Sequence, residues 1–188
     1  MNIMTSRLFI GYKIPRKIIE TIAMVRSTLN DNKKIFNWVS GNNLHLTLLF
    51  LGDHETDVID SMSNQIEDII KLHGDFTISV NGTGTFGNRN EILWLNIDKG
   101  RENLQRINYE LQTTMSKYLN DRLKTKFTPH LTVARKKKTE INNNFDVKNF
   151  MNSVYSPLEF HINFFTLFES RIVNNKVYYK RITKFNLT

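Results

Sequence analysis

The sequence predicts an α+β fold with largely antiparallel sheets, and three observations support this class. The chain has 188 residues, 40% of them hydrophobic, which suits one globular domain or two small lobes that share one unit. Strand-like and helix-like segments are mixed without the regular alternation or Gly-rich turns of a doubly wound sheet. Two pairs of strand-like segments are each joined by a short Asn-containing turn, as antiparallel neighbours are. We therefore expect residues 1–188 to form a single domain.

The first half of the chain predicts a strand, a helix, a buried strand and a second helix. Residues 7–13 carry the β-branched and aromatic side chains of a strand, and Pro15 follows at a position that the start of a helix tolerates. Residues 44–51 form a compact apolar run closed by Gly52, which is typical of a buried strand. Apolar residues at helical spacing define the two helices: Ile18, Ile22, Val25 and Leu29, then Ile59, Met62, Ile66, Ile69 and Ile70.

The second half predicts two strand pairs with a helix and a further strand between them. Residues 76–86 and 92–97 are expected to pair around a turn at 87–90. Residues 127–135 form the further strand, in which Pro129 favours an edge or a strand start. The other expected elements are a helix with Leu104, Ile107, Leu111 and Met115, a polar loop over 136–144, a short helix over 145–154, and closing strands over 160–168 and 176–185.

The charge is distributed unevenly along the chain, whose formal net charge is +8. Residues 1–94 carry nine Lys and Arg and ten Asp and Glu, whereas residues 95–188 carry seventeen and eight. This excess has two interpretations, a solvated surface or a one-sided field that attracts a polyanion, and composition does not choose between them.

Cysteine is absent from the sequence. This excludes disulfides, thiolate metal sites and cysteine nucleophiles, and it favours a cytoplasmic location. We also expect no signal peptide and no contact with a membrane, because the sequence has no apolar segment of sufficient length.

Two similar tripeptides, His45-Leu46-Thr47 and His130-Leu131-Thr132, are the strongest functional signal. On a strand, residues i and i+2 point to the same face, so each histidine and its threonine would project together. If the two strands lie side by side or across a cleft, two imidazoles and two hydroxyls meet. Imidazole serves as a general base and imidazolium as a general acid, which suits phosphodiester chemistry without a metal. The tripeptides alone leave packed structural histidines as the alternative.

The sequence around both tripeptides resembles a known family. Residues 43–52 (NLHLTLLFLG) and 127–135 (FTPHLTVAR) resemble the two signature motifs of the two-histidine (2H) phosphoesterases. Within that superfamily the chain is similar to the RNA 2′,3′-cyclic phosphodiesterases, which are LigT-like and were formerly called 2′-5′ RNA ligases. The resemblance extends over nearly the whole chain, with Val133 in place of the more usual leucine.

The resemblance implies a fold, a reaction and a role for each motif residue. The fold would be bilobal, with pseudo-symmetric antiparallel sheets, outer helices and a central cleft. The reaction would open the terminal 2′,3′-cyclic phosphate of RNA to a 2′-phosphate, with no metal and no cofactor, in a protein that we expect to be a monomer. His45 would be the proton donor and His130 the proton acceptor, although their spacing does not distinguish these roles, and a reverse 2′-5′ RNA ligase reaction would exchange them. Thr47 and Thr132 would bind the phosphate, and Arg135 would contact a base or a phosphate unless it is a solvated strand end.

Other aromatic and histidine residues are expected to be structural. Phe9, Phe50 and Phe127 are assigned to the core, although an aromatic ring at the cleft edge would also stack on a base. His54 and His73 are expected at the surface, and His161 is taken as structural. Lys136, Lys137 and Lys138 extend the second motif with positive charge that either contacts RNA or aids solubility.

Three alternatives remain open at this point. A sister activity, the cleavage of 2′-5′ oligoadenylate or of another cyclic nucleotide, would use the same four residues. A non-catalytic RNA-binding module would keep the cleft and the basic half, although two complete His-x-Thr pairs argue against it. A metal-dependent hydrolase is disfavoured because the two histidines lack neighbours at ligand spacing.

Overall fold

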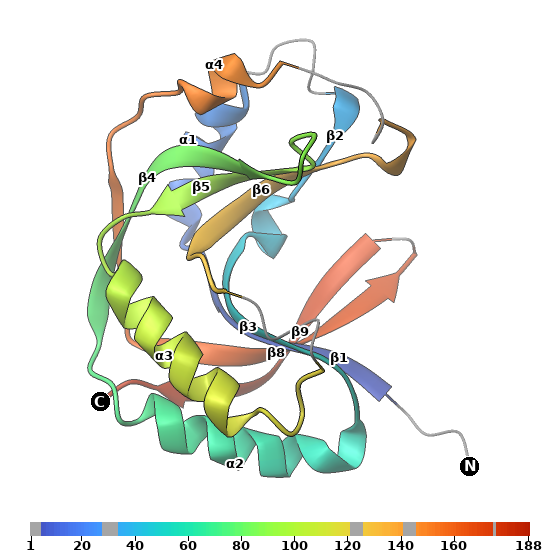
Figure 1. Ribbon diagram of the computed structural model, residues 1–188, viewed down its shortest axis with the longest axis vertical. Coiled ribbons are helices and arrows are strands. Elements are labelled where there is room, and N and C mark those ends of the chain that lie inside the picture. Colours follow the sequence, from blue (N-terminus) through green and yellow to red (C-terminus); the bar gives the residue numbers. More distant parts are fainter. Residues whose placement is uncertain (1–4, 28–33, 121–125, 141–145, 175) are drawn as a thin grey trace.

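The computed structural model describes residues 5–27, 34–120, 126–140, 146–174 and 176–188, and it contains two antiparallel sheets (Figure 1), which both contribute side chains to a cleft between them. One sheet has four strands in the order β3-β1-β8-β9, and the other has five in the order β2-β6-β5-β4-β7. The strands are β1 (Thr5–Lys13), β2 (Phe36–Trp38), β3 (His45–Glu55), β4 (Phe76–Phe86), β5 (Ile92–Ile97), β6 (His130–Lys136), β7 (Leu158–Ile162), β8 (Phe164–Val173) and β9 (Lys176–Asn186). The predicted α+β class with antiparallel sheets is confirmed.

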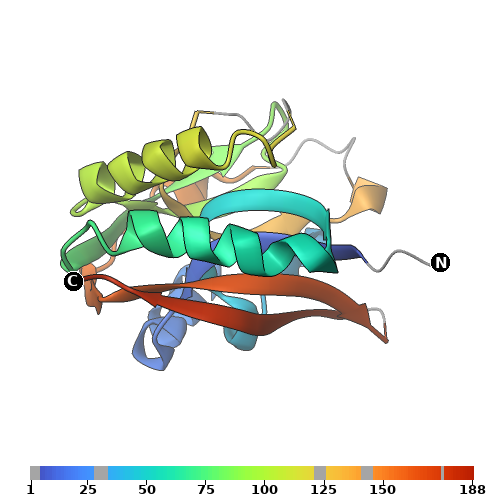
Figure 2. The same cartoon turned by 90° about the horizontal axis from the view of Figure 1, so that it is seen from below.

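The helices lie outside the sheets, as expected. They are α1 (Arg16–Ser27), α2 (Ile59–Ile70), α3 (Arg101–Thr114) and α4 (Lys148–Met151), with short 3-10 turns at Gly41–Asn43, Thr56–Val58 and Lys138–Glu140. Figure 2 shows α2 and α3 running alongside each other, and they contact β9 and β3 of the four-stranded sheet. Met62, Ile66 and Ile70 of α2 are fully buried, as their i, i+4 spacing predicts. No helix in the described parts of the chain is long and apolar enough to cross a membrane.

The structure differs from the expected elements at three places. The strand expected over 127–135 begins only at His130, because Pro129 has no N–H to pair with a neighbouring strand. The segment expected as one strand over 160–168 is divided at Asn163 between β7, which pairs with β4, and β8, which pairs with β1. The short strand β2 pairs with β6 and had no expected counterpart.

Three other expectations have a mixed outcome. The helix after Pro15 begins at Arg16. The helix expected over 145–154 is reduced to the four residues of α4. Part of the expected loop over 136–144 belongs to β6 and to a 3-10 turn, and its residues 141–144 lie outside the described residues, as does Leu29.

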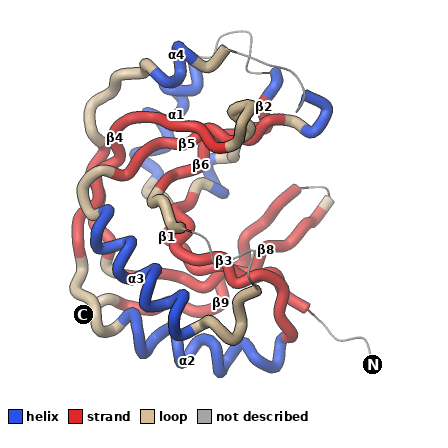
Figure 3. The backbone as a smooth tube through the Cα atoms, in the orientation of Figure 1, coloured by secondary structure: helices blue, strands red, loops and turns tan. Residues whose placement is uncertain are grey.

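The arrangement of the sheets brings the two motif strands together. β3 is an edge strand of the four-stranded sheet, and β6 lies inside the five-stranded sheet between β2 and β5. These two strands contact each other across the cleft, where Figure 3 shows the sheets approaching. Residues 85 positions apart in the sequence, His45 and His130, each occupy the first position of their strand.

Candidate active site

The two His-x-Thr pairs line one small cavity between the sheets. His45 and Thr47 come from β3, and His130 and Thr132 come from β6. All four border a cavity of about 60 Å³, together with Val39, Phe50, Arg135 and Tyr179. Each pair points to the same face of its strand because side chains alternate along a strand. The structure thus brings together the five site residues that the sequence singles out.

Both histidines are held by the same local hydrogen bond. The Nδ1 of His45 lies 2.6 Å from the carbonyl oxygen of Asn43, and the Nδ1 of His130 lies 2.7 Å from that of Thr128. Because a carbonyl oxygen only accepts hydrogen bonds, each Nδ1 must carry a proton and donate it. In the neutral form, each Nε2 therefore bears the lone pair. The two rings have the same tautomer, with Nε2 as the atom that can exchange protons.

Aromatic rings fix the plane of each imidazole. Phe9 and Tyr179 lie against His45, with ring centroids 4.9 and 4.8 Å away. Phe86 and Trp94 lie against His130, with centroids 4.8 and 5.9 Å away. Each histidine therefore has one hydrogen-bonded nitrogen and two ring neighbours, which leaves little freedom to rotate.

Burial is the main influence on the protonation of both histidines. It lowers the pKa of His45, and the positive charges of Arg135 and His130 lower it further, while the hydrogen bond to Asn43 opposes this. Burial likewise lowers the pKa of His130, with Arg135 adding to the effect and the hydrogen bond to Thr128 opposing it. Both rings are therefore neutral down to a lower pH than an ordinary histidine, and a bound anion would favour protonating them.

Arg135 contributes charge at the edge of the cavity. It lies on β6 opposite Asn37 of β2 and Ile92 of β5, and it is solvent-exposed. Its effect on the pKa of both histidines and of Tyr179 places its charge near all three rings. Such a cation at the mouth of a phosphate-sized cavity would attract an anionic substrate.

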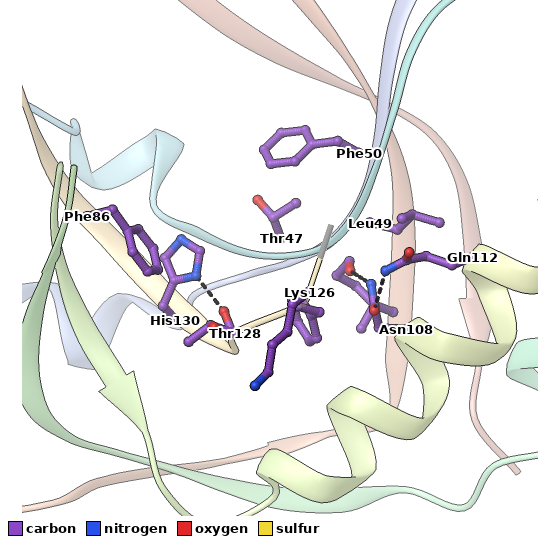
Figure 4. Close-up of a pocket in the computed structure, with 11 residues that line it drawn as sticks. Thr47, Leu49, Phe50, Phe86, Asn108, Gln112, Lys126, Thr128 and His130 are labelled. Carbon is purple, nitrogen blue, oxygen red and sulfur yellow. Dashed lines mark hydrogen bonds between the residues drawn. The ribbon is translucent and has the colours of Figure 1, made fainter. Parts of the chain in front are cut away.

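Two larger cavities flank this small cavity, which we call the catalytic cavity after the role that the sequence predicts for its histidines. The one beside His130, of about 320 Å³, is lined by Phe50, Phe86, Phe127, the amide side chains of Asn108 and Gln112 of α3, and Lys126 (Figure 4). The other lies beside His45, has a volume of about 500 Å³, and shares His45 and Tyr179 with the catalytic cavity.

Some residues of these walls have no individual signal in the sequence. Tyr179 lies on β9, far from both motifs in the sequence, and no pattern there predicts a place in the site. Asn108 lies on the buried face of an ordinary amphipathic helix, where its Nδ2 donates to the Leu48 carbonyl at 2.7 Å. A polar residue at a core position of α3 was the one available sign.

Several expectations for individual side chains are wrong. His73 is buried, with 4% of its surface exposed, and its Nε2 lies 2.9 Å from Glu110, whereas a surface position was expected. Phe50 is 48% exposed at the cleft rather than in the core, because it faces the cavities between the sheets. Lys136 is buried and donates to the Arg89 carbonyl, so it does not extend the surface charge beyond Arg135.

The remaining side chains differ in how far they follow expectation. Phe9 is buried, as predicted, but against His45 of the site. Phe127 is partly buried and lines the cavity beside His130. His54 is half-buried, with its Nε2 3.0 Å from the Leu51 carbonyl, and His161 is exposed and lies 3.0 Å from Asp75. Across the described ranges, no group of three or more His, Asp and Glu side chains is arranged to hold a metal ion.

Comparison with known proteins shows which family the chain resembles. A family model described as the 2′-5′ RNA ligase superfamily matches residues 14–171. A protein of Methanocaldococcus jannaschii named RNA 2′,3′-cyclic phosphodiesterase is 30% identical over 131 residues, which cover 70% of this chain and 72% of that protein. A protein of Aquifex aeolicus with the same name is 29% identical over 133 residues, covering 69% and 70%.

Solved structures show the same fold. The crystal structure of Escherichia coli LigT without ligand matches with a TM-score of 0.77 and 21% identity, over 98% of both chains. The structure of E. coli LigT complexed with 3′-AMP matches with a TM-score of 0.76, also at 21% identity and over 98% of both chains. At this identity the two likenesses concern the arrangement of sheets and helices.

Proposed function

Because this chain belongs to the 2′-5′ RNA ligase superfamily, we propose that it is an RNA 2′,3′-cyclic phosphodiesterase that acts by a two-histidine mechanism. The substrate is RNA that ends in a 2′,3′-cyclic phosphate, and the product is a 2′-phosphate. The names of the relatives and the resemblance of both motifs support the substrate. The observation that carries the mechanism is the pair of Nδ1–carbonyl hydrogen bonds, which present two imidazole Nε2 atoms to one small cavity.

The reaction needs one proton acceptor and one proton donor on opposite sides of the phosphorus. The neutral Nε2 of His130 takes a proton from water as the water oxygen bonds to phosphorus. The bond from phosphorus to the ribose 3′ oxygen breaks, and His45 in its imidazolium form gives its Nε2 proton to that oxygen. Atoms and charge balance with water as the only co-reactant, and each histidine ends in the protonation state that the other had. A positioned acid or base contributes about 10²- to 10⁴-fold in rate.

Hydroxyl groups and a cation would stabilise the phosphorane-like transition state. Thr47 and Thr132 line the cavity from opposite sheets, so their hydroxyls can donate to the two non-bridging phosphate oxygens. Arg135 adds positive charge at the cavity edge. No step calls for a metal or a cofactor. Since all five residues come from this chain, the site is complete in a monomer, and the lack of cysteine supports a cytoplasmic location.

Turnover of a defined RNA end tests this function. A short RNA with a 2′,3′-cyclic phosphate should be converted to a 2′-phosphate in the presence of a chelator, as identified by phosphorus NMR or by phosphatase and nuclease mapping. Formation of a 3′-phosphate would contradict the assigned leaving oxygen. Loss of activity on chelation would contradict the mechanism, and preferential cleavage of 2′-5′ oligoadenylate would favour the sister activity.

A further inference from the structure

The cavity beside His45 carries more positive charge than its neighbour: Lys13 and Arg181 line it, whereas Lys126 is the one Lys or Arg among the described residues that line the cavity beside His130. We propose that this cavity binds the terminal nucleotide of the RNA together with the phosphodiester on its 5′ side, and that the RNA chain leaves the cleft over the β8–β9 hairpin. The inference rests on the proposed function and adds the direction of the RNA across the site. The cavity measures about 500 Å³, enough for a nucleotide, and it shares the lining residues His45 and Tyr179 with the catalytic cavity.

The direction in which the leaving oxygen departs places the terminal ribose. The entering water and the leaving oxygen lie on opposite sides of the phosphorus in an in-line reaction. The leaving 3′ oxygen belongs to the terminal ribose, and His45 protonates it, so that ribose must lie on the His45 side. The base and the 5′ oxygen belong to the same nucleoside and follow the ribose there. The cavity beside His130 is left to the attacking water.

The cavity beside His45 has a positively charged lining. Lys13 and Arg181 both border the cavity beside His45, and no Asp or Glu is among its described lining residues. Lys13 is the last residue of β1 and pairs with His45 on the neighbouring strand. Its side chain therefore leaves the backbone close to the imidazole ring of His45. Arg181 stands opposite Phe168, which stacks on Phe9 beneath His45. Two cations at the rim of a nucleotide-sized cavity provide what a phosphodiester needs.

The strand that carries Arg181 also shows that this placement is specific. Opposite residues of an antiparallel pair share a face, so Arg181 faces the cleft with Phe168. The next residue, Lys180, pairs with Glu169 and points to the other face of the sheet. Its positive charge acts on the Glu169 carboxyl, whose pKa is held below its ordinary value mainly by Arg171. Neighbouring cations on one strand thus have separate surroundings, which gives the test a matched control.

Aromatic rings and the hairpin extend the surface away from the catalytic cavity. Tyr179 lines both this cavity and the catalytic cavity, and Tyr178, which also lines it, is 58% exposed, so that a base can stack on its ring. The hairpin projects beyond the rest of its sheet (Figure 1). It is tied to the site by Asn43, whose Nδ2 donates to the Val177 carbonyl at 2.8 Å while its own carbonyl accepts from His45. A chain bound along the hairpin would therefore be held in register with the catalytic ring.

The experiment compares two mononucleotides that differ by one phosphate. Adenosine 2′,3′-cyclic phosphate with a free 5′-hydroxyl and the same compound with a 5′-phosphate are assayed for kcat/KM. The 5′-phosphate should raise kcat/KM in the wild-type protein, and the gain should shrink as salt rises. In Arg181→Gln, and separately in Lys13→Gln, the ratio of the two kcat/KM values should fall by about threefold to tenfold, as expected for a partly exposed ionic hydrogen bond. Lys180→Gln, which removes the same charge from the other face, should keep the wild-type ratio.

Failure of the inference differs from failure of the proposed function. If the wild-type protein turns over neither compound nor a cyclic-phosphate RNA, the proposed function is wrong. If it turns over both mononucleotides equally, the cavity does not bind the 5′-phosphate. A ratio that falls in Lys126→Gln, at the cavity beside His130, but not in Arg181→Gln would place the RNA on the opposite side. An equal fall in Lys180→Gln would reduce the effect to net charge, and thermal unfolding of each variant verifies that it is folded.

Discussion

Removal of the two threonine hydroxyls tests whether they bind the reacting phosphate. Thr47→Val and Thr132→Val keep the shape and the strand preference of the side chain and remove only the hydroxyl group. A hydrogen bond to a charged group contributes about 1.5–3 kcal/mol. Since about 1.36 kcal/mol corresponds to tenfold in rate, the loss in kcat/KM lies between about 13-fold and about 160-fold for each hydroxyl. Both threonines are only partly buried, so we expect the lower half of this range, up to about 45-fold.

The assay is the steady-state hydrolysis of a cyclic-phosphate dinucleotide, and a conservative variant serves as its control. Thr47→Ser and Thr132→Ser retain the donor and should recover most of the activity, which a purely structural threonine would not require. Urea unfolding of the four variants shows whether stability changes. A valine variant within twofold of wild-type kcat/KM, or a serine variant no better than the valine one, would refute the assignment of that threonine.

Four further predictions address the histidines and the residues around them. His45→Ala and His130→Ala should each lower kcat by about 10²- to 10⁴-fold with an unchanged circular dichroism spectrum, and near-normal turnover by either would contradict the mechanism. The pH profile of kcat/KM should be bell-shaped with both limbs below the ordinary histidine region of about 6.5, since burial lowers both pKa values. Arg135→Gln removes a charge that opposes imidazolium, so both limbs should move to higher pH, and unmoved limbs would place Arg135 outside the site. In Gly84→Ala, the added methyl group would overlap the Trp94 ring, which packs on His130. This variant should lower the free energy of unfolding in urea by about 1–3 kcal/mol and slow catalysis. An unaffected variant would show that the Trp94 ring moves freely.

The sequence predicts the chemistry of the site better than its surroundings. Strand periodicity suffices to put His45 with Thr47 and His130 with Thr132, because that relation is local. The meeting of the two pairs is not local. It depends on β3 pairing with β1 and on β6 pairing with β5, strands that lie far from them in the sequence, and the expectation of a shared cleft came from resemblance to a family.

Residues that reach the site across the fold could not be found by local patterns. Tyr179 contacts His45 only because β9 joins the four-stranded sheet next to β8, which itself pairs with β1. The wrong expectation for Phe50 has a similar cause. An apolar run predicts a buried strand, but an edge strand beside a cleft leaves some of its side chains facing open space. The expectation that His73 lies at the surface is wrong for a related reason. Its partner, Glu110, lies on α3, 37 positions away, where no local pattern reveals it.

The two halves of the site are chemically alike, and this explains why the sequence does not tell the acid from the base. Each histidine has a carbonyl partner two residues earlier, a threonine two residues later and two aromatic neighbours. Nothing within this local unit makes one ring the donor. The difference lies outside it: two cations, Lys13 and Arg181, line the cavity beside His45, whereas the cavity beside His130 has one, Lys126, among amides and phenylalanines. An anionic chain bound beside His45 would stabilise its imidazolium form more than that of the distant ring. On this argument the substrate itself assigns the roles, and it does so through the same contacts that set its direction across the cleft.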